Sequence, residues 1–286
     1  MISPALLLLA AEAEAHDATL LSVAGDSAAF LVTLLLLDGR EMTWSVDLMA
    51  EGDFVSVREQ PGGGLPLHCP IRHINTDATF CTGWSGHENK TVVDAAGAVL
   101  WWARLLQFLR LQERAARLRR WPDRRAWAHG ITAAGHQQDA EAAAARLGRH
   151  FSAALEWGRL ALSPPVHRNS MNGASIALLL DGVVQFRVWA DHPRLVNMRQ
   201  PCVCERGQGR PRAAMKGCGK SANGSHADAA VSLVRSMLKQ QEAEKAFWRA
   251  HAGRPCCGTM DDCPLAAKNS AANDDGDQCG LERNVA

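Results

Sequence analysis

Apolar and polar residues alternate over short runs in the first quarter of the chain, and this pattern predicts antiparallel strands. We expect an amphipathic helix in the apolar opening stretch, residues 1–15. Residues 28–37 and 41–48 then form two β-rich runs around the turn dipeptide Asp38-Gly39, which indicates a hairpin. A third strand is expected over residues 54–58, ended by the glycine-rich loop that follows it.

Beyond residue 90 the spacing of apolar positions becomes helical. Residues 92–120 carry an apolar face with most arginines outside it, and Trp121-Pro122 ends this helix. A second helix is predicted over residues 136–147, where Gly148 is a suitable terminator. We interpret the arginines as a solvated helix surface, because Glu113 lies among them.

The remainder of the chain is predicted to contain a linker, a second hairpin and a long helix, in that order. Prolines and small polar residues at 163–165 and 170–173 indicate a linker or domain edge. A second hairpin is predicted from residues 174–180 and 183–189, and a helix over 227–251. The Asn-, Asp- and Gly-rich tail, residues 269–286, is expected to be disordered.

Length and composition narrow the class of protein. The 286 residues suffice for about two domains, and a hydrophobic fraction of 47% excludes wholesale disorder. Thirty-one Lys and Arg stand against 30 Asp and Glu, and this balance supports neither nucleic acid nor a membrane as a partner. No apolar run approaches the ~20 residues that span a bilayer, so we expect a cytoplasmic protein.

The segment with the most specific chemistry is residues 65–81. It resembles the approach to the active site of ubiquitin-conjugating enzymes, in particular of the bacterial members found in antiphage-defence and ubiquitin-like modification operons. In that family a proline-containing loop leads to a His-x-Asn element, a short turn, an apolar residue and the catalytic cysteine. The matching residues here are Pro66, Pro70, His73, Asn75, the turn Thr76-Asp77-Ala78, Phe80 and Cys81.

The resemblance covers roughly residues 1–150 and departs from the family pattern at two positions. Ile74 stands where eukaryotic members have proline, and Ala78 stands where glycine is usual. The family likeness implies an α+β fold, with an antiparallel meander flanked by helices. We therefore expect a ubiquitin-conjugating-like (UBC-like) catalytic domain over 1–150, followed by a smaller cysteine-rich α+β domain over 165–265.

The same resemblance implies a function for each matching residue. Cys81 would accept a ubiquitin-like modifier as a thioester from an adenylating activating enzyme and pass it to an amine of a target protein. Asn75 would stabilise the tetrahedral oxyanion, and His73 would hold the loop. His129 could return to the active site, or serve as a capping or core histidine. This thioester chemistry needs no cofactor.

Three other interpretations of these residues remain open. A cysteine hydrolase could use Cys81 as nucleophile and His129 as base, an order along the chain that cysteine peptidases share. A non-catalytic UBC-like binding module would keep the fold without transfer. A zinc site could also be drawn from Cys69, His73, Cys81 and His87, although their spacing does not match the common paired knuckles.

The cysteines are concentrated in the second half of the chain. In a reducing cytosol, such clustering in a small domain favours a structural zinc ion over disulfides. Buried free thiols, or a redox pair of Cys202 with Cys204, are the alternatives, and Cys279 lies in the tail. The six candidate zinc ligands are Cys202, Cys204, Cys218, Cys256, Cys257 and Cys263.

Overall fold

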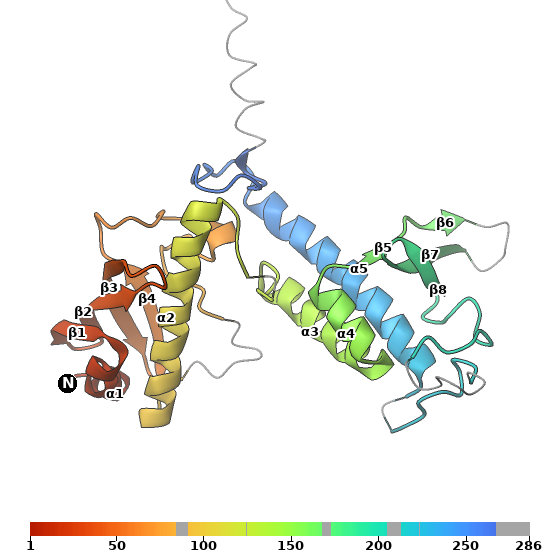
Figure 1. The fold of residues 1–286 in the computed structure, drawn as a ribbon, viewed down its shortest axis with the longest axis horizontal. Helices are drawn as coiled ribbons and strands as arrows, with labels where there is room; N and C mark the ends of the chain where they lie inside the picture. Colours follow the sequence, from red (N-terminus) through yellow and green to blue (C-terminus); the bar gives the residue numbers. More distant parts are fainter. Residues whose placement is uncertain (84–90, 124, 168–172, 205–212, 223, 267–286) are drawn as a thin grey trace, which may run out of the picture. The chain divides into compact units, whose positions relative to one another are not determined.

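The computed structural model describes residues 1–83, 91–123, 125–167, 173–204, 213–222 and 224–266 (Figure 1). The chain divides into two compact units. The first unit comprises Met1–Asp123 together with the returning segment Ala250–Ala286, and the second comprises Arg124–Arg249. The two units are described in turn.

The sheet of the first unit is an antiparallel meander in the order β1-β2-β3-β4. The predicted meander is confirmed, with one additional strand, β1, at its edge. Strand β1 was not predicted because its sequence lacks the alternation of apolar and polar residues. Most of its residues are exposed, so no buried face requires that alternation. The elements before the long helix of this unit are α1 (Pro4–Glu12), η1 (Glu14–His16), β1 (Ala18–Ala24), β2 (Ser27–Leu35), β3 (Glu41–Glu51), β4 (Phe54–Glu59) and η2 (Pro70–Arg72).

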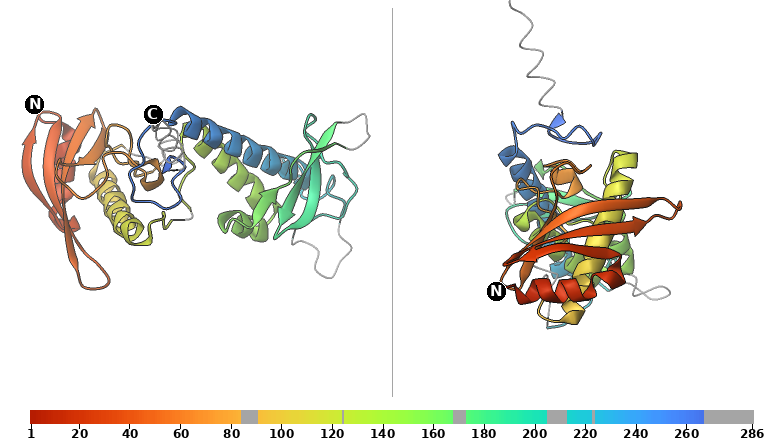
Figure 2. Two further views of the ribbon diagram at one scale, coloured as in Figure 1. Left: turned by 90° about the horizontal axis from the view of Figure 1, so that it is seen from above. Right: turned by 90° about the vertical axis from the view of Figure 1, so that its left-hand side faces the viewer.

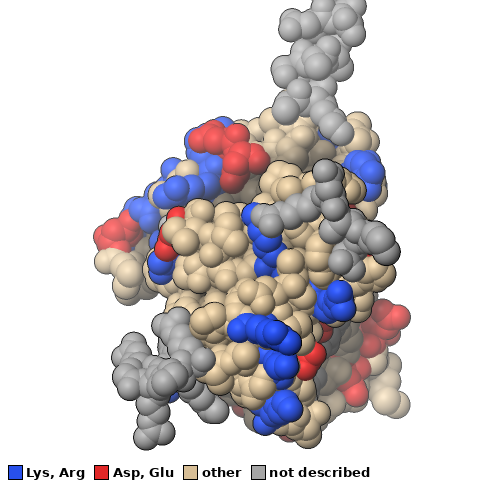
Figure 3. All heavy atoms as spheres, turned by 90° about the vertical axis from the view of Figure 1, so that its right-hand side faces the viewer, with Lys and Arg blue, Asp and Glu red and all other residues tan. Residues whose placement is uncertain are grey.

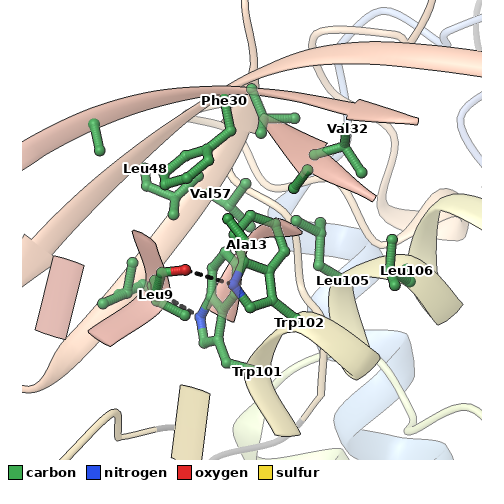
Figure 4. Close-up of a cluster of buried hydrophobic side chains, with 14 of the residues drawn as sticks. Leu9, Ala13, Phe30, Val32, Leu48, Val57, Trp101, Trp102, Leu105 and Leu106 are labelled. Carbon is green, nitrogen blue, oxygen red and sulfur yellow. Dashed lines mark hydrogen bonds between the residues drawn. The ribbon is translucent and has the colours of Figure 1, made fainter. Parts of the chain in front are cut away.

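Helix α2 (Ala95–Leu118) crosses one face of this sheet (Figure 2). Its N-terminus is capped by Asp94, whose carboxylate accepts the N–H of Gly97 at 2.7 Å. Helix α1 packs beside α2, and Trp102 of α2 is fully buried between helix and sheet (Figure 4). Its indole N–H donates to the carbonyl of Leu9 at 2.9 Å, so the buried ring leaves no polar atom unsatisfied.

The second unit packs three helices against a small antiparallel sheet. Strand β7 lies between β8 on one side and β5 and β6 on the other. The predicted hairpin is confirmed as β7 and β8, with Phe151 and Phe186 in the shared core. The elements are α3 (Ile131–Leu147), α4 (Arg149–Glu156), β5 (Leu160–Leu162), β6 (Val166–His167), β7 (Ala174–Leu180), β8 (Val183–Trp189) and α5 (His226–Ala250).

The structure divides the chain earlier than the predicted boundary between residues 150 and 165. Helix α3 belongs to the second unit, because its buried alanines, Ala140, Ala143 and Ala144, share a core with β8 and α5. The Ser163-Pro164-Pro165 segment is part of the sheet edge, since the N–H of Ser163 donates to Ala177 at 2.9 Å. The tail predicted to be disordered lies outside the described residues.

Two further features of the described residues bear on function. None of their helices combines the length and apolar composition needed to cross a bilayer. On the face drawn in Figure 3, Lys and Arg side chains lie in separate groups, some of them beside Asp or Glu.

Candidate functional site

Residues 73–81 form a small hairpin of their own. The N–H of Cys81 donates to the carbonyl of His73 at 2.8 Å, and the N–H of Asn75 donates to the carbonyl of Thr79 at 2.9 Å. The hairpin is attached to the sheet through β4, because the N–H of Phe80 donates to the carbonyl of Val57 at 2.8 Å. The end of the segment that resembles an active-site approach, residues 73–81, thus extends the antiparallel meander.

The pairing of this hairpin sorts its side chains onto two faces. Ile74 pairs with Phe80, and both side chains are buried in the core of the first unit. Side chains alternate along paired segments, so the intervening residues project from the opposite face. That outward face carries Asn75, Thr79 and Cys81, whereas His73 lies outside the alternation because its backbone is left-handed, with φ 54°.

The turn of the hairpin is closed by hydrogen bonds between side chains. The Asn75 amide donates to Thr79 Oγ1 at 3.0 Å, and that hydroxyl donates to the Asp77 carboxylate at 2.6 Å. The hydrogen bond from Thr79 is the main cause that holds the pKa of Asp77 below its usual value. Ala78 adopts a left-handed backbone with φ 65°, which explains why glycine is usual at this position.

The Cys81 thiol is partly exposed at the end of the hairpin. Its Sγ lies 3.6 Å from the carbonyl oxygen of Gly83, and the chain beyond Gly83 is outside the described residues up to 90. The ring of His73 packs on Trp121, with ring centroids 4.8 Å apart. His73 therefore contributes both a backbone acceptor and a packed ring to this loop.

The approach to the hairpin is held by a buried arginine that the sequence analysis did not identify. Arg72 is 3% exposed, and its guanidinium donates to the side chain and carbonyl of Gln112 on α2 at 2.7 and 3.1 Å. The Gln112 amide in turn donates to the carbonyl of Arg72 at 2.6 Å. This reciprocal pair joins the loop to the long helix, and no local sequence signal marks it.

His129 belongs to the second unit, where it joins the start of α3 to α5. Its Nδ1 lies 2.9 Å from Glu244 Oε1, and its ring packs on Trp248 with centroids 4.8 Å apart. The pKa of Glu244 is lowered, chiefly by the side-chain hydrogen bond with His129. These contacts fit the structural role considered for His129, and its participation with Cys81 stays a prediction.

Three of the six predicted zinc ligands form a cluster in the second unit with a histidine that was not predicted. Cys202 Sγ lies 3.2 Å from His226 Nδ1, and Cys204 Sγ lies 3.6 Å from Cys218 Sγ. All four donor atoms fall within 4.8 Å of one another. Ligands at ~2.0–2.3 Å around a tetrahedral ion are separated by ~3.3–3.8 Å, so these residues could hold zinc.

A glycine makes room for the histidine of this cluster. A Cβ at Gly219, which has φ 66°, would overlap the His226 ring. His226 is also fixed by its own N–H, which donates to the carbonyl of Cys218 at 2.9 Å. The only sequence cue was the position of this histidine at the start of the last predicted helix.

The other three predicted ligands lie elsewhere, so the six do not form one centre. Cys256, Cys257 and Cys263 follow α5, whose 25 residues extend ~37 Å, and they belong to the first unit. There the Cys257 and Cys69 sulfurs are 2.9 Å apart. Their mutual hydrogen bond is the main cause that lowers the pKa of Cys257 to about 5 and raises that of Cys69.

Comparisons with known proteins agree with the boundary near residue 124, although the second match includes the segment after α5 that the structure groups with the first unit. A family model described as the prokaryotic E2 domain matches residues 16–123. A second, described as a cysteine-rich domain C-terminal to the E2 domain, matches residues 128–265. No curated protein and no solved structure matches the chain.

Proposed function

The chain belongs to the prokaryotic E2 family, with the cysteine-rich domain that follows E2 domains, and from this premise we propose that it is a conjugating-enzyme-like transferase. In this proposal Cys81 carries a ubiquitin-like modifier as a thioester and delivers it to an amine of a target protein. The observation that carries the proposal is the hairpin face on which a partly exposed Cys81 accompanies Asn75, with the Cys81 N–H hydrogen-bonded to the carbonyl of His73.

The proposed transfer has two steps. In the first, the Cys81 thiolate attacks the activated C-terminal carbonyl of the modifier, and the thiol of the adenylating activating enzyme leaves. In the second, the target amine attacks the thioester, a tetrahedral oxyanion forms, the C–S bond breaks and the amine loses a proton. The Asn75 amide is the neutral donor on this face that could stabilise the oxyanion.

A single-turnover assay tests the function. The protein is incubated with the adenylating enzyme, ATP and a small β-grasp protein encoded beside it, and we expect an adduct that reductant removes. Cys81→Ser is the informative variant, because its hydroxyl would give an adduct that resists reductant. Cys81→Ala should give none, and an unchanged adduct in that variant would overturn the assignment.

The same assay separates the two alternatives. A non-catalytic binding module would retain the modifier or the activating enzyme in a pull-down and form no adduct. A cysteine hydrolase would cleave a modifier fusion without ATP. Genes for an adenylating enzyme and a β-grasp protein beside this one would support the proposed place in a bacterial modification or antiphage-defence operon, in the cytoplasm.

We also propose that the cluster Cys202, Cys204, Cys218 and His226 holds a structural zinc ion. The spacing of the donor atoms and the space left by Gly219 support this assignment. Four protein ligands leave no open position, which is typical of structural rather than catalytic zinc. The ion would supply folding free energy to the irregular segment between β8 and α5.

A further inference from the structure

After α5 the chain returns to the first unit, and the returning residues 251–266 lie against the loop that precedes η2. The ring of His68 in that loop stacks on the ring of His251, with centroids 5.8 Å apart. At the next position of the loop, Cys69 Sγ lies 2.9 Å from Cys257 Sγ. Two thiols that are 188 positions apart in the sequence are therefore brought into direct contact within one unit.

The separation of these two sulfurs suits the formation of a covalent bond. A disulfide bond is ~2.05 Å long, so the two Sγ atoms need to approach by only ~0.9 Å. Small rotations of the two side chains can supply this movement. Cys257 is partly exposed, whereas Cys69 is buried. An oxidant arriving from solvent would therefore meet Cys257 first, with Cys69 directly behind it.

The polar surroundings of Cys257 favour its thiolate form, which is the form that oxidants attack. Its Sγ lies 3.1 Å from Thr259 Oγ1, and the buried guanidinium of Arg72 donates to the same hydroxyl at 3.4 Å. The hydrogen bond with Cys69 is the main cause that lowers the pKa of Cys257, and the Thr259 hydroxyl and the Arg72 charge act in the same direction. Exposure and charge thus both indicate that oxidation begins at Cys257.

We propose that Cys69 and Cys257 form a reversible disulfide when a hydroperoxide oxidises Cys257. The Cys257 thiolate attacks the terminal oxygen of the peroxide, the O–O bond breaks, and a sulfenic acid forms while hydroxide or alkoxide leaves. Cys69 then gives up its proton and attacks the sulfenic sulfur, so the S–S bond forms and the displaced hydroxide becomes water. The two sulfurs together lose two electrons, and the peroxide gains them.

This disulfide would fasten the returning segment to the hairpin that ends at Cys81. The Cys69 N–H donates to the carbonyl of Ile74 at 3.1 Å, and the Ile74 N–H donates to the carbonyl of Cys69 at 3.0 Å. Ile74 is one of the two hairpin residues buried in the core of the first unit. The bond would also restrict the unfolded chain, so it should stabilise the folded first unit. The proposal depends on the thiol pair and not on the transfer activity.

Peptide mapping of the full chain tests the proposal. The reduced protein is treated with hydrogen peroxide, the remaining thiols are alkylated, and linked peptides are identified by mass spectrometry. We expect a linkage between Cys69 and Cys257 that dithiothreitol removes. Cys257→Ser should abolish it, whereas Cys256→Ser, the matched control at the neighbouring and also partly exposed thiol, should keep it. Oxidation of Cys257 to a sulfinic acid without the linkage, or its linkage to a different cysteine, would overturn the proposal.

Thermal unfolding of the unsubstituted protein covers the case in which a variant does not fold. After peroxide treatment the Tm of the first unit should rise by roughly 5–10 °C, and dithiothreitol should restore the original value. Cys81→Ser should show the same rise, because the bond does not involve Cys81, and this control separates the proposal from the transfer function. An unchanged Tm of the first unit in fully linked protein would contradict the fastening of the segment to the hairpin.

Discussion

Ala78 is the residue at which the hairpin of residues 73–81 is strained. Its φ of 65° costs a residue with a Cβ ~1–2 kcal/mol, and glycine avoids this cost but loses ~0.5–1 kcal/mol through greater freedom when unfolded. We expect Ala78→Gly to stabilise the first unit by up to ~1 kcal/mol, measured as a higher Tm. Ala24→Gly in β1, where φ is ordinary, should instead lower the Tm. An equal decrease of the Tm in both variants would contradict the explanation.

Asn75 offers a test that separates chemistry from loop shape. Asn75→Ala should slow the attack of an amine on the preformed Cys81 thioester by about a hundredfold or more, the usual effect of removing an oxyanion donor. Thr79→Ala breaks the same 3.0 Å hydrogen bond but keeps the Asn75 amide, so the rate of amine attack should fall much less. The measurement is single-turnover discharge of the thioester. Similar losses in both variants would show that Asn75 only shapes the turn.

At the scale of residues, the sequence singled out the residues of the loop but not the contacts that hold the loop in place. His73, Asn75 and Cys81 were predicted because their spacing follows a family pattern. The contact of Arg72 with Gln112 spans 40 positions, and no local spacing encodes it. His226 was not predicted for the same reason. Its cysteine partners lie in an irregular segment, and no sequence motif links them to the histidine.

The helices of the second unit are linked by Glu244 of α5 and His129 at the entry to α3. The lowered pKa of Glu244 means that its carboxylate stabilises the folded state above the unfolded-state pKa, and that this contribution is lost as pH falls through the lower folded-state value. Stability should therefore decrease below about pH 4.5, the ordinary value of a glutamate. Thermal melts of wild type and Glu244→Gln should differ by on the order of 1 kcal/mol near neutrality and converge in acid. A difference that stays constant with pH would contradict this role.

Gly219 and Gly182 provide a matched pair of substitutions that test the proposed zinc site. Gly219→Ala combines a left-handed φ with overlap on the His226 ring, whereas Gly182→Ala has the same backbone cost, with φ 80°, and open space around its Cβ. Both should lower stability by ~1–2 kcal/mol. Only Gly219→Ala should also weaken zinc binding, measured by competition with a chromogenic chelator. Equal zinc affinity in the two variants would exclude His226 as a ligand.

At the scale of elements, periodicity predicted the helices and strands that have one apolar face. It missed the elements whose pattern is interrupted. Helix α2 and the hairpin of β7 and β8 have a clear apolar face. Helix α4 was missed because Gly148, with φ 134°, breaks the helix and lets a second one begin. Prolines at 164 and 165 are typical of a linker or domain edge, but in the structure they lie between β5 and β6 of one sheet.

At the scale of the molecule, the two units should respond separately to loss of the zinc site proposed in the second unit. Cys204→Ser/Cys218→Ser removes two ligands of a site confined to the second unit, so that unit should melt at a lower temperature while the first unit melts as before. Adduct formation on Cys81 should persist, because the thioester needs no metal. Calorimetry and the adduct assay provide the measurements, and loss of both transitions together would contradict independent units.

The return of the chain to its first unit has a consequence for protein synthesis. Residues 1–123 emerge from the ribosome first, yet the segment that packs against their loop and against the end of α2 is made only after the whole second unit. The first unit therefore begins to fold early and acquires this segment only after the second unit has been made. A chain that terminates anywhere before Cys257 lacks the partner of Cys69, so a prematurely ended product carries Cys81 on an incompletely supported loop.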